Sequence, residues 1–316
     1  MAALDTTQPL TSQRCRELIR ALGETYDFVR WEVLTYTAFQ RPVDALVIGN
    51  GPRRVLFTAA HHANEWLTGY ILLQFCQDLA QAILEGGSLM GISARALQEA
   101  VTIYMVPMVD PDGVDLVTGA IGPGQQQYTY AQRIAQDYPA IPFPDGWKAN
   151  LLGVDLNLNY PARWLQAREI KFRQGFISPA PRDYVGRAPL DQAETQALAG
   201  YTEVVDPALV LAFHSQGKEI YWQFGGIPVE GARELGEIFA RLSGYTLTDP
   251  PENSANAGYK DWFIQEFRRP GYTIEVGRGV NPLPVSQFPE IYRDNLGILL
   301  AAALGYDPES PTGNEE

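Results

Sequence analysis

Histidine is scarce in this chain, and its three copies occur at only two places. His61 and His62 follow one short apolar segment, and His214 follows another. Glu65 lies three residues after His62, a spacing that lets an imidazole and a carboxylate in a tight turn face the same ion. His61 has Asn64 at that spacing, and an amide is a poor zinc ligand. Two histidines and one glutamate form a ligand set for catalytic zinc, whose fourth position stays open for water.

An H-x-x-E pair also occurs by chance, and a lone histidine at a strand end is more often a hydrogen-bonded core residue. The combination is more informative. His62 and His214 each lie at the carboxyl end of a predicted strand, and Glu275 lies within a third predicted strand. In open α/β sheets, substrates and cofactors bind beyond the carboxyl ends of the strands. Residues at those ends are therefore expected to converge on one site. We therefore predict a zinc site formed by His62, Glu65 and His214, with Glu275 nearby.

The elements that must position these residues alternate between short apolar segments and amphipathic ones. This order predicts an α/β fold, with a doubly wound mixed sheet flanked by helices. The predicted strands cover residues 28–47 (one or two strands), 54–60, 101–107, 209–213, 220–224 and 272–276. The predicted helices cover residues 11–23, closed by Gly23, 67–85, 191–205, opened by a capping box at Asp191–Glu194, 229–243, 257–268 and 287–304.

Residues 119–187 are rich in Gly, Pro, Gln, Tyr and Trp and show weak periodicity. We interpret them as a long, mostly irregular but ordered segment, and such segments are usually functional. No linker or repeat is visible. The sequence therefore predicts one catalytic domain over residues 1–306, followed by an acidic tail over residues 307–316.

The composition excludes several classes of protein. Of the 316 residues, 46% are hydrophobic and 19% are charged, which is typical of a globular chain. A net charge of -13 disfavours binding to nucleic acid or to an anionic membrane. No apolar run reaches the roughly 18–20 residues that span a bilayer. No signal peptide is visible, so a cytoplasmic location is expected, or secretion if the chain belongs to a longer precursor.

Six segments give the sequence a resemblance to the zinc carboxypeptidase family, from about residue 54 to residue 288. They occur in the family's order and spacing: HHANEW (61–66), MVDPDG (108–113), GWK (146–148), GVDLNLN (153–159), FHSQG (213–217) and TIEVG (273–277). The resemblance implies the family's mixed α/β fold and a peptidase activity that depends on one zinc ion. It also implies a cis peptide bond between Ser215 and Gln216.

The resemblance assigns roles to further residues. It implies that Glu275 is the general base of peptide hydrolysis, in addition to the three zinc ligands. It implies that Asp155 hydrogen-bonds a ligand imidazole and fixes its tautomer. The family stabilises the oxyanion with an arginine that follows a tryptophan. Here Lys148 follows Trp147 and is the candidate for that role, with a solvated loop lysine as the alternative.

One departure from the family concerns the substrate. Carboxypeptidases carry Asn-Arg in the segment that matches Asn157 and Leu158, and that arginine binds the free C-terminal carboxylate. Leucine cannot make this contact. A closer resemblance, to bacterial γ-D-glutamyl-L-diamino acid peptidases, rests on HSQGKEIYW (214–222), GYKDWF (258–263) and TIEVGRGVNPLPVSQF (273–288). These enzymes cleave the bond between γ-D-glutamate and diaminopimelate in peptidoglycan stem peptides, which implies a peptide or muropeptide substrate.

Such a substrate carries several carboxylates, so cationic residues are expected to hold it. The candidates are Lys148, Lys218, Lys260 and Arg278, and we expect at least one of Lys148, Lys260 and Arg278 to lie beside the cleft. The predicted substrate-binding residues are Asn157, Lys260 and Arg278. For Lys260, the alternative that it is an exposed lysine on a helix, with no role in binding, has equal weight. Two other functions stay open: a general metallocarboxypeptidase and an inactive binding module.

Overall fold

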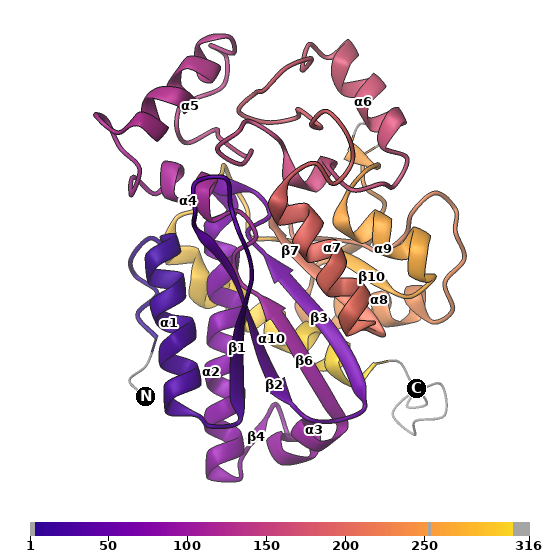
Figure 1. Ribbon diagram of the computed structural model, residues 1–316. Coiled ribbons are helices and arrows are strands. Elements are labelled where there is room, and N and C mark those ends of the chain that lie inside the picture. Colours follow the sequence, from indigo (N-terminus) through magenta and orange to yellow (C-terminus); the bar gives the residue numbers. More distant parts are fainter. Residues whose placement is uncertain (1–3, 252–253, 306–316) are drawn as a thin grey trace.

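Eight strands form one mixed sheet in the computed structural model, in the order β1-β2-β6-β3-β7-β10-β8-β9 (Figure 1). The structure describes residues 4–251 and 254–305, so the predicted acidic tail lies outside the described residues. The strands are β1 (Val29–Tyr36), β2 (Pro42–Gly49), β3 (Arg53–Ala59), β6 (Val101–Val106), β7 (Leu209–Ser215), β8 (Glu219–Tyr221), β9 (Thr246–Thr248) and β10 (Gly271–Val276). A separate short hairpin consists of β4 (Ser88–Leu89) and β5 (Ile92–Ser93).

Four neighbouring strands, β6, β3, β7 and β10, run parallel at the centre of the sheet. The strands β1 and β2 are antiparallel to each other, and β2 is antiparallel to β6. Strand β8 is antiparallel to β10 and parallel to β9. The predicted segment 28–47 is therefore two strands. The predicted strand 220–224 was placed too late, because the paired residues are Glu219–Tyr221.

Helices cover both faces of the sheet, as the doubly wound prediction requires. One face packs against α1 (Ser12–Thr25), α2 (Gly69–Glu85), α3 (Ala94–Ala100), α8 (Ala232–Ser243) and α10 (Phe288–Leu304). The other face packs against α7 (Ala193–Val205) and α9 (Tyr259–Phe267). Three more helices, α4 (Pro111–Val117), α5 (Gln126–Gln136) and α6 (Trp164–Arg173), lie toward the upper end of the molecule in Figure 1.

The apolar runs in the central strands follow from this double cover. In β3, Val55 and Phe57 pack into the core below one face of the sheet, while Leu56 packs into the core on the other face. In β7, Leu211 packs into the same core as Val55 and Phe57, and Val210 packs into the core on the other face. Every position of β7 and the last five positions of β3 are buried, so these residues form nearly continuous apolar segments in the sequence.

Two predicted helix signals were wrong. Helix α1 continues past Gly23, whose missing Cβ leaves room for the ring of Trp31, since an added Cβ would lie 2.6 Å from Cδ1 of that ring. Helix α7 begins after Gln192, and no side chain caps it. The expected capping residue, Asp191, instead accepts a hydrogen bond from the amide group of Asn159 at 2.9 Å.

The segment 119–187 is irregular over most of its length, as predicted, but it contains α5 and α6. Neither helix was predicted. No side chain caps α5, and α6 alternates polar and apolar residues without one clear apolar face. Both helices and the surrounding loops lie above the edge of the sheet where β3 and β7 end (Figure 1). The segment therefore lies where it can form walls around a site at that edge.

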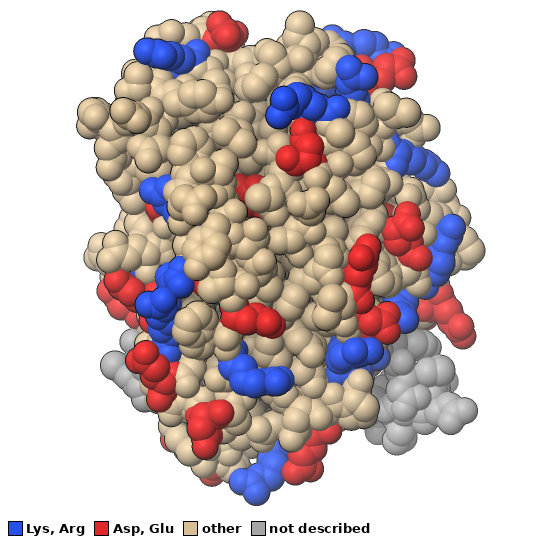
Figure 2. Space-filling model, viewed as in Figure 1, with Lys and Arg blue, Asp and Glu red and all other residues tan. Residues whose placement is uncertain are grey.

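On the face drawn in Figure 2, lysine and arginine side chains are interspersed with aspartate and glutamate side chains. Within residues 4–251 and 254–305, no helix is both long and apolar enough to cross a membrane. The expected cytoplasmic location and the single-domain boundary at residue 306 stay predictions.

Candidate active site

The two histidine positions and Glu275 come together because β3, β7 and β10 are adjacent parallel strands. In the sheet register Ala59 pairs with Phe213, and His214 pairs with Glu275. The residues that follow β3 and the last residues of β7 and β10 therefore lie at one edge of the sheet. This is the convergence that the sequence predicted.

A short 3-10 helix, η1 (Ala63–Thr68), follows β3 and carries Glu65, with His62 directly before it. The hydroxyl of Thr68 donates to the carbonyl of Glu65 at 2.8 Å and accepts from the amide of Ala60 at 2.9 Å. These two bonds hold the turn against the end of β3. Held in this way, η1 and the residue before it direct the side chains of Glu65 and His62 toward β7.

The MVDPDG segment supports this turn from behind. The amide of Asp110 donates to the carbonyl of Ala60 at 3.0 Å. At Gly113 a Cβ would lie 2.8 Å from the Cβ of Ala63 and 2.5 Å from the carbonyl of Ala149, so only glycine fits between them. Helix α4 can therefore pack directly against η1.

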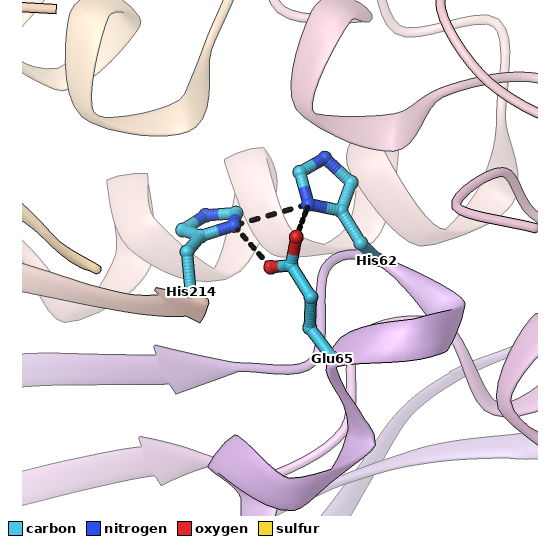
Figure 3. Close-up of side chains that lie close together, drawn as sticks. All are labelled: His62, Glu65 and His214. Atoms are coloured by element: carbon cyan, nitrogen blue, oxygen red, sulfur yellow. Dashed lines mark hydrogen bonds and ion pairs between the residues drawn. The ribbon is translucent and has the colours of Figure 1, made fainter. Parts of the chain in front are cut away.

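His62, Glu65 and His214 converge as Figure 3 shows. The Nδ1 atoms of His62 and His214 lie 3.2 Å apart, and each lies 2.9 Å from one oxygen of the Glu65 carboxylate. All three side chains are buried, and their ligand atoms lie within 4.8 Å of one another. Two imidazole nitrogens and a carboxylate that face one point fit a zinc ion.

Asp155 lies where the resemblance implied. Its Oδ1 is 3.2 Å from Nε2 of His62, which leaves Nδ1 of the same ring directed at Glu65. Burial lowers the pKa of His62, but Glu65 and Asp155 outweigh it and raise that pKa to about 9. Burial raises the pKa of Asp155, but His62 and Lys148 outweigh burial and lower that pKa below its usual value. Asp155 is therefore a charged group that fixes the orientation of His62.

His61 does not join the cluster. Its ring stacks on His214 at 5.5 Å between centroids, and its Nε2 lies 3.4 Å from the hydroxyl of Tyr160. Burial, followed by the neighbouring histidines, lowers the pKa of His61 well below its usual value. A neutral, fully buried imidazole of this kind is a packing residue behind the site.

The peptide bond between Ser215 and Gln216 is cis, as the resemblance implied. The amide of Ser215 donates to Oε2 of Glu65 at 3.2 Å, and its hydroxyl donates to Oδ1 of Asn281 at 2.8 Å. The end of β7 is thus tied both to the ligand carboxylate and to residues 279–282.

Lys148 is not a solvated loop lysine. Its Nζ lies 3.1 Å from Oε1 of Glu65, and its side chain is 19% exposed. Burial lowers the pKa of Lys148, but Glu65 and Asp155 outweigh it and raise that pKa. Its carbonyl accepts from the amide of Ala63, and its amide donates to the carbonyl of Pro181. The ammonium group is held beside the predicted ligands, and its role toward an oxyanion stays a prediction.

Glu275 is half-buried and faces the cleft near the cluster without belonging to it. Burial and the charge of Glu65 raise the pKa of Glu275 to about 8, against the opposing charges of Lys148 and His62. A carboxylate with an affinity for protons near neutrality is suited to accept and return a proton.

Two cavities meet in front of these residues, and both are lined by Lys148, Glu275, Arg182 and Tyr221. The first has a volume of about 170 Å³ and reaches down to Asn157, Leu158 and Lys260. The second has a volume of about 790 Å³ and runs along residues 140–146 and 279–282. The first is the size of a side chain, and the second can hold a longer stretch of peptide.

The predicted substrate-binding residues are divided between the first cavity and the surface. Asn157 lines the first cavity, and its Oδ1 accepts from the amide of Tyr259 at the start of α9. Lys260 lines the same cavity and is buried, with its Nζ 2.6 Å from both Oδ1 of Asp261 and the carbonyl of Gln223. Lys260 is therefore not an exposed helix lysine.

Arg278 and Lys218 lie elsewhere. Arg278 is exposed and lines neither of the two cavities. Lys218 pairs with Glu290 at 2.7 Å and with Asp294 at 2.9 Å on α10, away from both cavities. Of the four cationic candidates, Lys148 and Lys260 thus lie beside the cleft.

Sequence reasoning missed Arg182 and Tyr221, which line both cavities, and Lys171, which lines the first. Arg182 and Lys171 lie in the weakly periodic segment 119–187, where no motif marked a position. The only available signal was the expectation that this long ordered segment is functional. Tyr221 lies in the HSQGKEIYW segment but carries no distinctive spacing.

Comparison with known proteins is consistent with this geometry. Residues 15–297 match the sequence profile of the zinc carboxypeptidases. The chain is also 42% identical over 285 residues to gamma-D-glutamyl-L-diamino acid endopeptidase 1 of Lysinibacillus sphaericus, covering 90% of this chain and 69% of that protein. This chain belongs to the zinc carboxypeptidase family. It is therefore a metallopeptidase by family, a hydrolase of peptide bonds, as the resemblance predicted.

Further relatives extend the match. An uncharacterized protein of Bacillus subtilis, YqgT, is 32% identical over 291 residues, covering 92% of this chain and 76% of that protein. Among solved structures, carboxypeptidase A from Helicoverpa armigera has a TM-score of 0.69 at 17% identity, covering 96% of this chain and 75% of that one. The latter match establishes the zinc carboxypeptidase fold, the mixed α/β sheet expected from the sequence.

Proposed function

We propose that this chain hydrolyses the amide bond between γ-D-glutamate and diaminopimelate, or another L-diamino acid, in peptidoglycan stem peptides. The observation that carries the proposal is the first cavity. Leu158 stands there in place of the arginine that would bind a C-terminal carboxylate, and a buried Lys260–Asp261 pair lines the wall. The name of the Lysinibacillus sphaericus relative supports the same substrate class.

One zinc ion is part of this proposal. His62, Glu65 and His214 would hold it through the three converging ligand atoms, with Asp155 orienting His62. When bound, zinc supplies a Lewis acid that polarises a carbonyl and lowers the pKa of a water molecule to about 7. Lys148 contributes a second positive charge where the carbonyl oxygen becomes negative.

Glu275 is the proposed general base. Its carboxylate oxygen takes a proton from the attacking water and later gives that proton to the leaving amine nitrogen. The position of Glu275 at the junction of both cavities supports this role, because the scissile bond must cross that junction. The residues of the first cavity then face the amine part of the substrate.

The first cavity suits a diamino acid. Diaminopimelate carries an amino and a carboxyl group at the far end of its side chain. A carboxylate or an ammonium group that enters a pocket needs a charged partner, because desolvation is otherwise costly. Lys260 and Asp261 offer one partner of each sign. An apolar C-terminal side chain would instead leave both groups without a substrate partner.

The test is hydrolysis of L-alanyl-γ-D-glutamyl-diaminopimelate, followed by mass spectrometry of both products. We expect free diaminopimelate and L-alanyl-D-glutamate. An N-blocked dipeptide with ordinary L-residues serves as the comparison, and we expect much slower cleavage. Equal rates on both substrates would favour a general metallocarboxypeptidase, and no cleavage of either by zinc-loaded protein would favour an inactive binding module.

A further inference from the structure

Arg182 stands at the junction of the two cavities. It lines both of them, as do Lys148, Glu275 and Tyr221. The first cavity is assigned above to the diamino acid, so the second receives the acyl part of the substrate. A group that belongs to both walls lies beside the scissile bond, at the point where the acyl part begins.

Arg182 has hydrogen-bond donors left for a substrate. Its Nε donates to Oδ2 of Asp183 at 2.7 Å, and its side chain is 42% exposed. Within the described residues its two terminal nitrogens have no hydrogen-bond partner. A guanidinium group bound through Nε alone can still present its terminal nitrogens to a carboxylate.

The arginine is also tied firmly to the predicted metal site. The amide of Asp183 donates to Oδ2 of Asp155, the same residue that orients His62. The other oxygen of Asp183 pairs with Nζ of Lys171 at 2.5 Å. On the preceding side, the carbonyl of Pro181 accepts from the amide of Lys148. These contacts set the place of Arg182 relative to the reacting atoms.

The other cations that line the cavities are already paired within the protein. Lys148 pairs with Glu65, Lys260 with Asp261, and Lys171 with Asp183. Of the two described cations that line the second cavity, Lys148 is held against Glu65 of the predicted metal site, whereas Arg182 is held through Nε alone and can offer its two terminal nitrogens. The second cavity is otherwise largely uncharged, with Asp145 as its further acidic residue.

We propose that Arg182 binds the free α-carboxylate of the γ-linked glutamyl residue and thereby selects γ-glutamyl over α-linked substrates. The proposal rests on the proposed function. In a γ-glutamyl amide this carboxylate follows the scissile carbonyl by a short chain of saturated carbons, on the acyl side. In an α-linked peptide no carboxylate occupies that place. Arginine matches a carboxylate with two parallel hydrogen bonds, which lysine does not.

The test compares two tripeptides that differ at one group. One is L-alanyl-γ-D-glutamyl-diaminopimelate, and the other carries isoglutamine, in which the α-carboxylate is a neutral carboxamide. For the wild-type protein we expect kcat/KM to be at least about 10-fold higher on the carboxylate peptide. For Arg182→Gln we expect a loss of about 30-fold or more on the carboxylate peptide and a change below about 3-fold on the carboxamide.

Two further variants refine the result. Arg182→Lys keeps the charge without the paired donors, so its loss on the carboxylate peptide should be intermediate. Arg187→Gln is the matched control, because Arg187 is exposed in the same segment and lines neither cavity. It should behave as the wild type on both peptides. Melting temperature and zinc content, measured on every variant, identify any that fails to fold.

Several outcomes would overturn the inference. Equal losses on both peptides would show that Arg182 is only structural, and no wild-type preference for the carboxylate would show that this group is not recognised. A third peptide, with lysine in place of diaminopimelate, separates the two ends of the substrate. If Arg182→Gln abolishes only the preference for diaminopimelate over lysine, Arg182 binds the amine side. If the wild type cleaves none of the peptides, the proposed function fails and the inference with it.

Discussion

Glu65 carries more contacts than any other group in the candidate site. It faces two imidazoles, the ammonium of Lys148 and the amide of Ser215. Burial alone would raise the pKa of this carboxyl group, but His62, Lys148 and His214 together lower it well below its usual value. Glu65 therefore stays ionised, which a zinc ligand must be.

At the residue scale, the first prediction concerns Glu275. The Glu275→Gln variant keeps the size of the side chain but removes the proton acceptor. We expect kcat to fall by about 10²–10⁴. Zinc content should not change, because Glu275 lies outside the ligand cluster. The rates come from steady-state hydrolysis of the diaminopimelate tripeptide, and the metal content comes from elemental analysis.

The matched control is Glu234→Gln, an exposed carboxylate on α8. It should leave kcat within about twofold of the wild type, as surface substitutions usually do. If Glu275→Gln keeps full activity, another group must carry the proton.

The second prediction concerns Lys260. In Lys260→Met the side chain keeps much of its length but loses its charge, which leaves Asp261 buried without its partner. We expect KM for the diaminopimelate tripeptide to rise by about 30-fold or more, because one member of a charged contact is removed. KM for the same tripeptide with lysine should change little, since that substrate lacks the distal carboxylate.

Lys218→Met is the control, because Lys218 pairs with α10 and lies outside both cavities. It should leave both KM values unchanged. A parallel rise on both tripeptides for Lys260→Met would show that Lys260 only supports the wall of the cavity.

At the element scale, the sequence was most informative about the strands that carry the site. The strands over 54–60 and 209–213 were predicted from their short apolar runs, a further strand was predicted over 272–276, and the structure confirms all three. Their shared carboxyl edge was enough to bring His62, His214 and Glu275 together. The helices and side chains of the segment 119–187 depend instead on contacts with residues that are distant in the sequence.

Helices α5 and α6 show why local pattern was insufficient. No side chain caps the start of either helix, and α6 has no clear apolar face, so neither had a clear start signal. The position of Arg182 depends on contacts with distant residues, such as the bond from Asp183 to Asp155. Likewise, the buried amide of Asn159 holds the carbonyls of Val185 and Ala188 in place. No spacing in the sequence records such contacts.

The third prediction concerns Glu194 in the first turn of α7. Burial and the charge of Asp112 raise its pKa to about 7, from an ordinary value of 4.5. The folded state therefore holds this proton more tightly than the unfolded chain, and stability falls as pH rises from about 4.5 to 7. The Glu194→Gln variant has no carboxyl group to ionise at this position, so its stability does not fall for this reason. Relative to the wild type, it should gain about 2–4 kcal/mol of unfolding free energy between pH 4.5 and 8.

The measurement is urea unfolding at both pH values. Glu203→Gln, an exposed position on the same helix, is the control and should show no such pH-dependent gain. A gain for Glu194→Gln that is the same at both pH values would mean that charge on Glu194 is not the cause.

At the scale of the whole molecule, the predicted metal ligands join separate parts of the chain. His62 and Glu65 follow β3, whereas His214 lies near the end of β7, and the long segment 119–187 separates them in the sequence. Asp155 and Lys148 connect that segment to the same cluster. An ion bound there would cross-link elements that are distant in sequence, and its binding energy would count toward folding.

The last prediction follows from this cross-link. A ligand that binds only the folded state stabilises it by about 2.7 kcal/mol at a free concentration of 100 times Kd. For a chain of 316 residues, that corresponds to a rise in Tm of about 4 °C when zinc is added to chelator-treated protein. The rise should increase with free zinc concentration and should accompany the return of peptidase activity. His214→Ala removes one of the three ligands and should lose both effects. If His214→Ala gains the same Tm on adding zinc, the stabilising ion binds elsewhere, and the assignment of this cluster as the metal site is wrong.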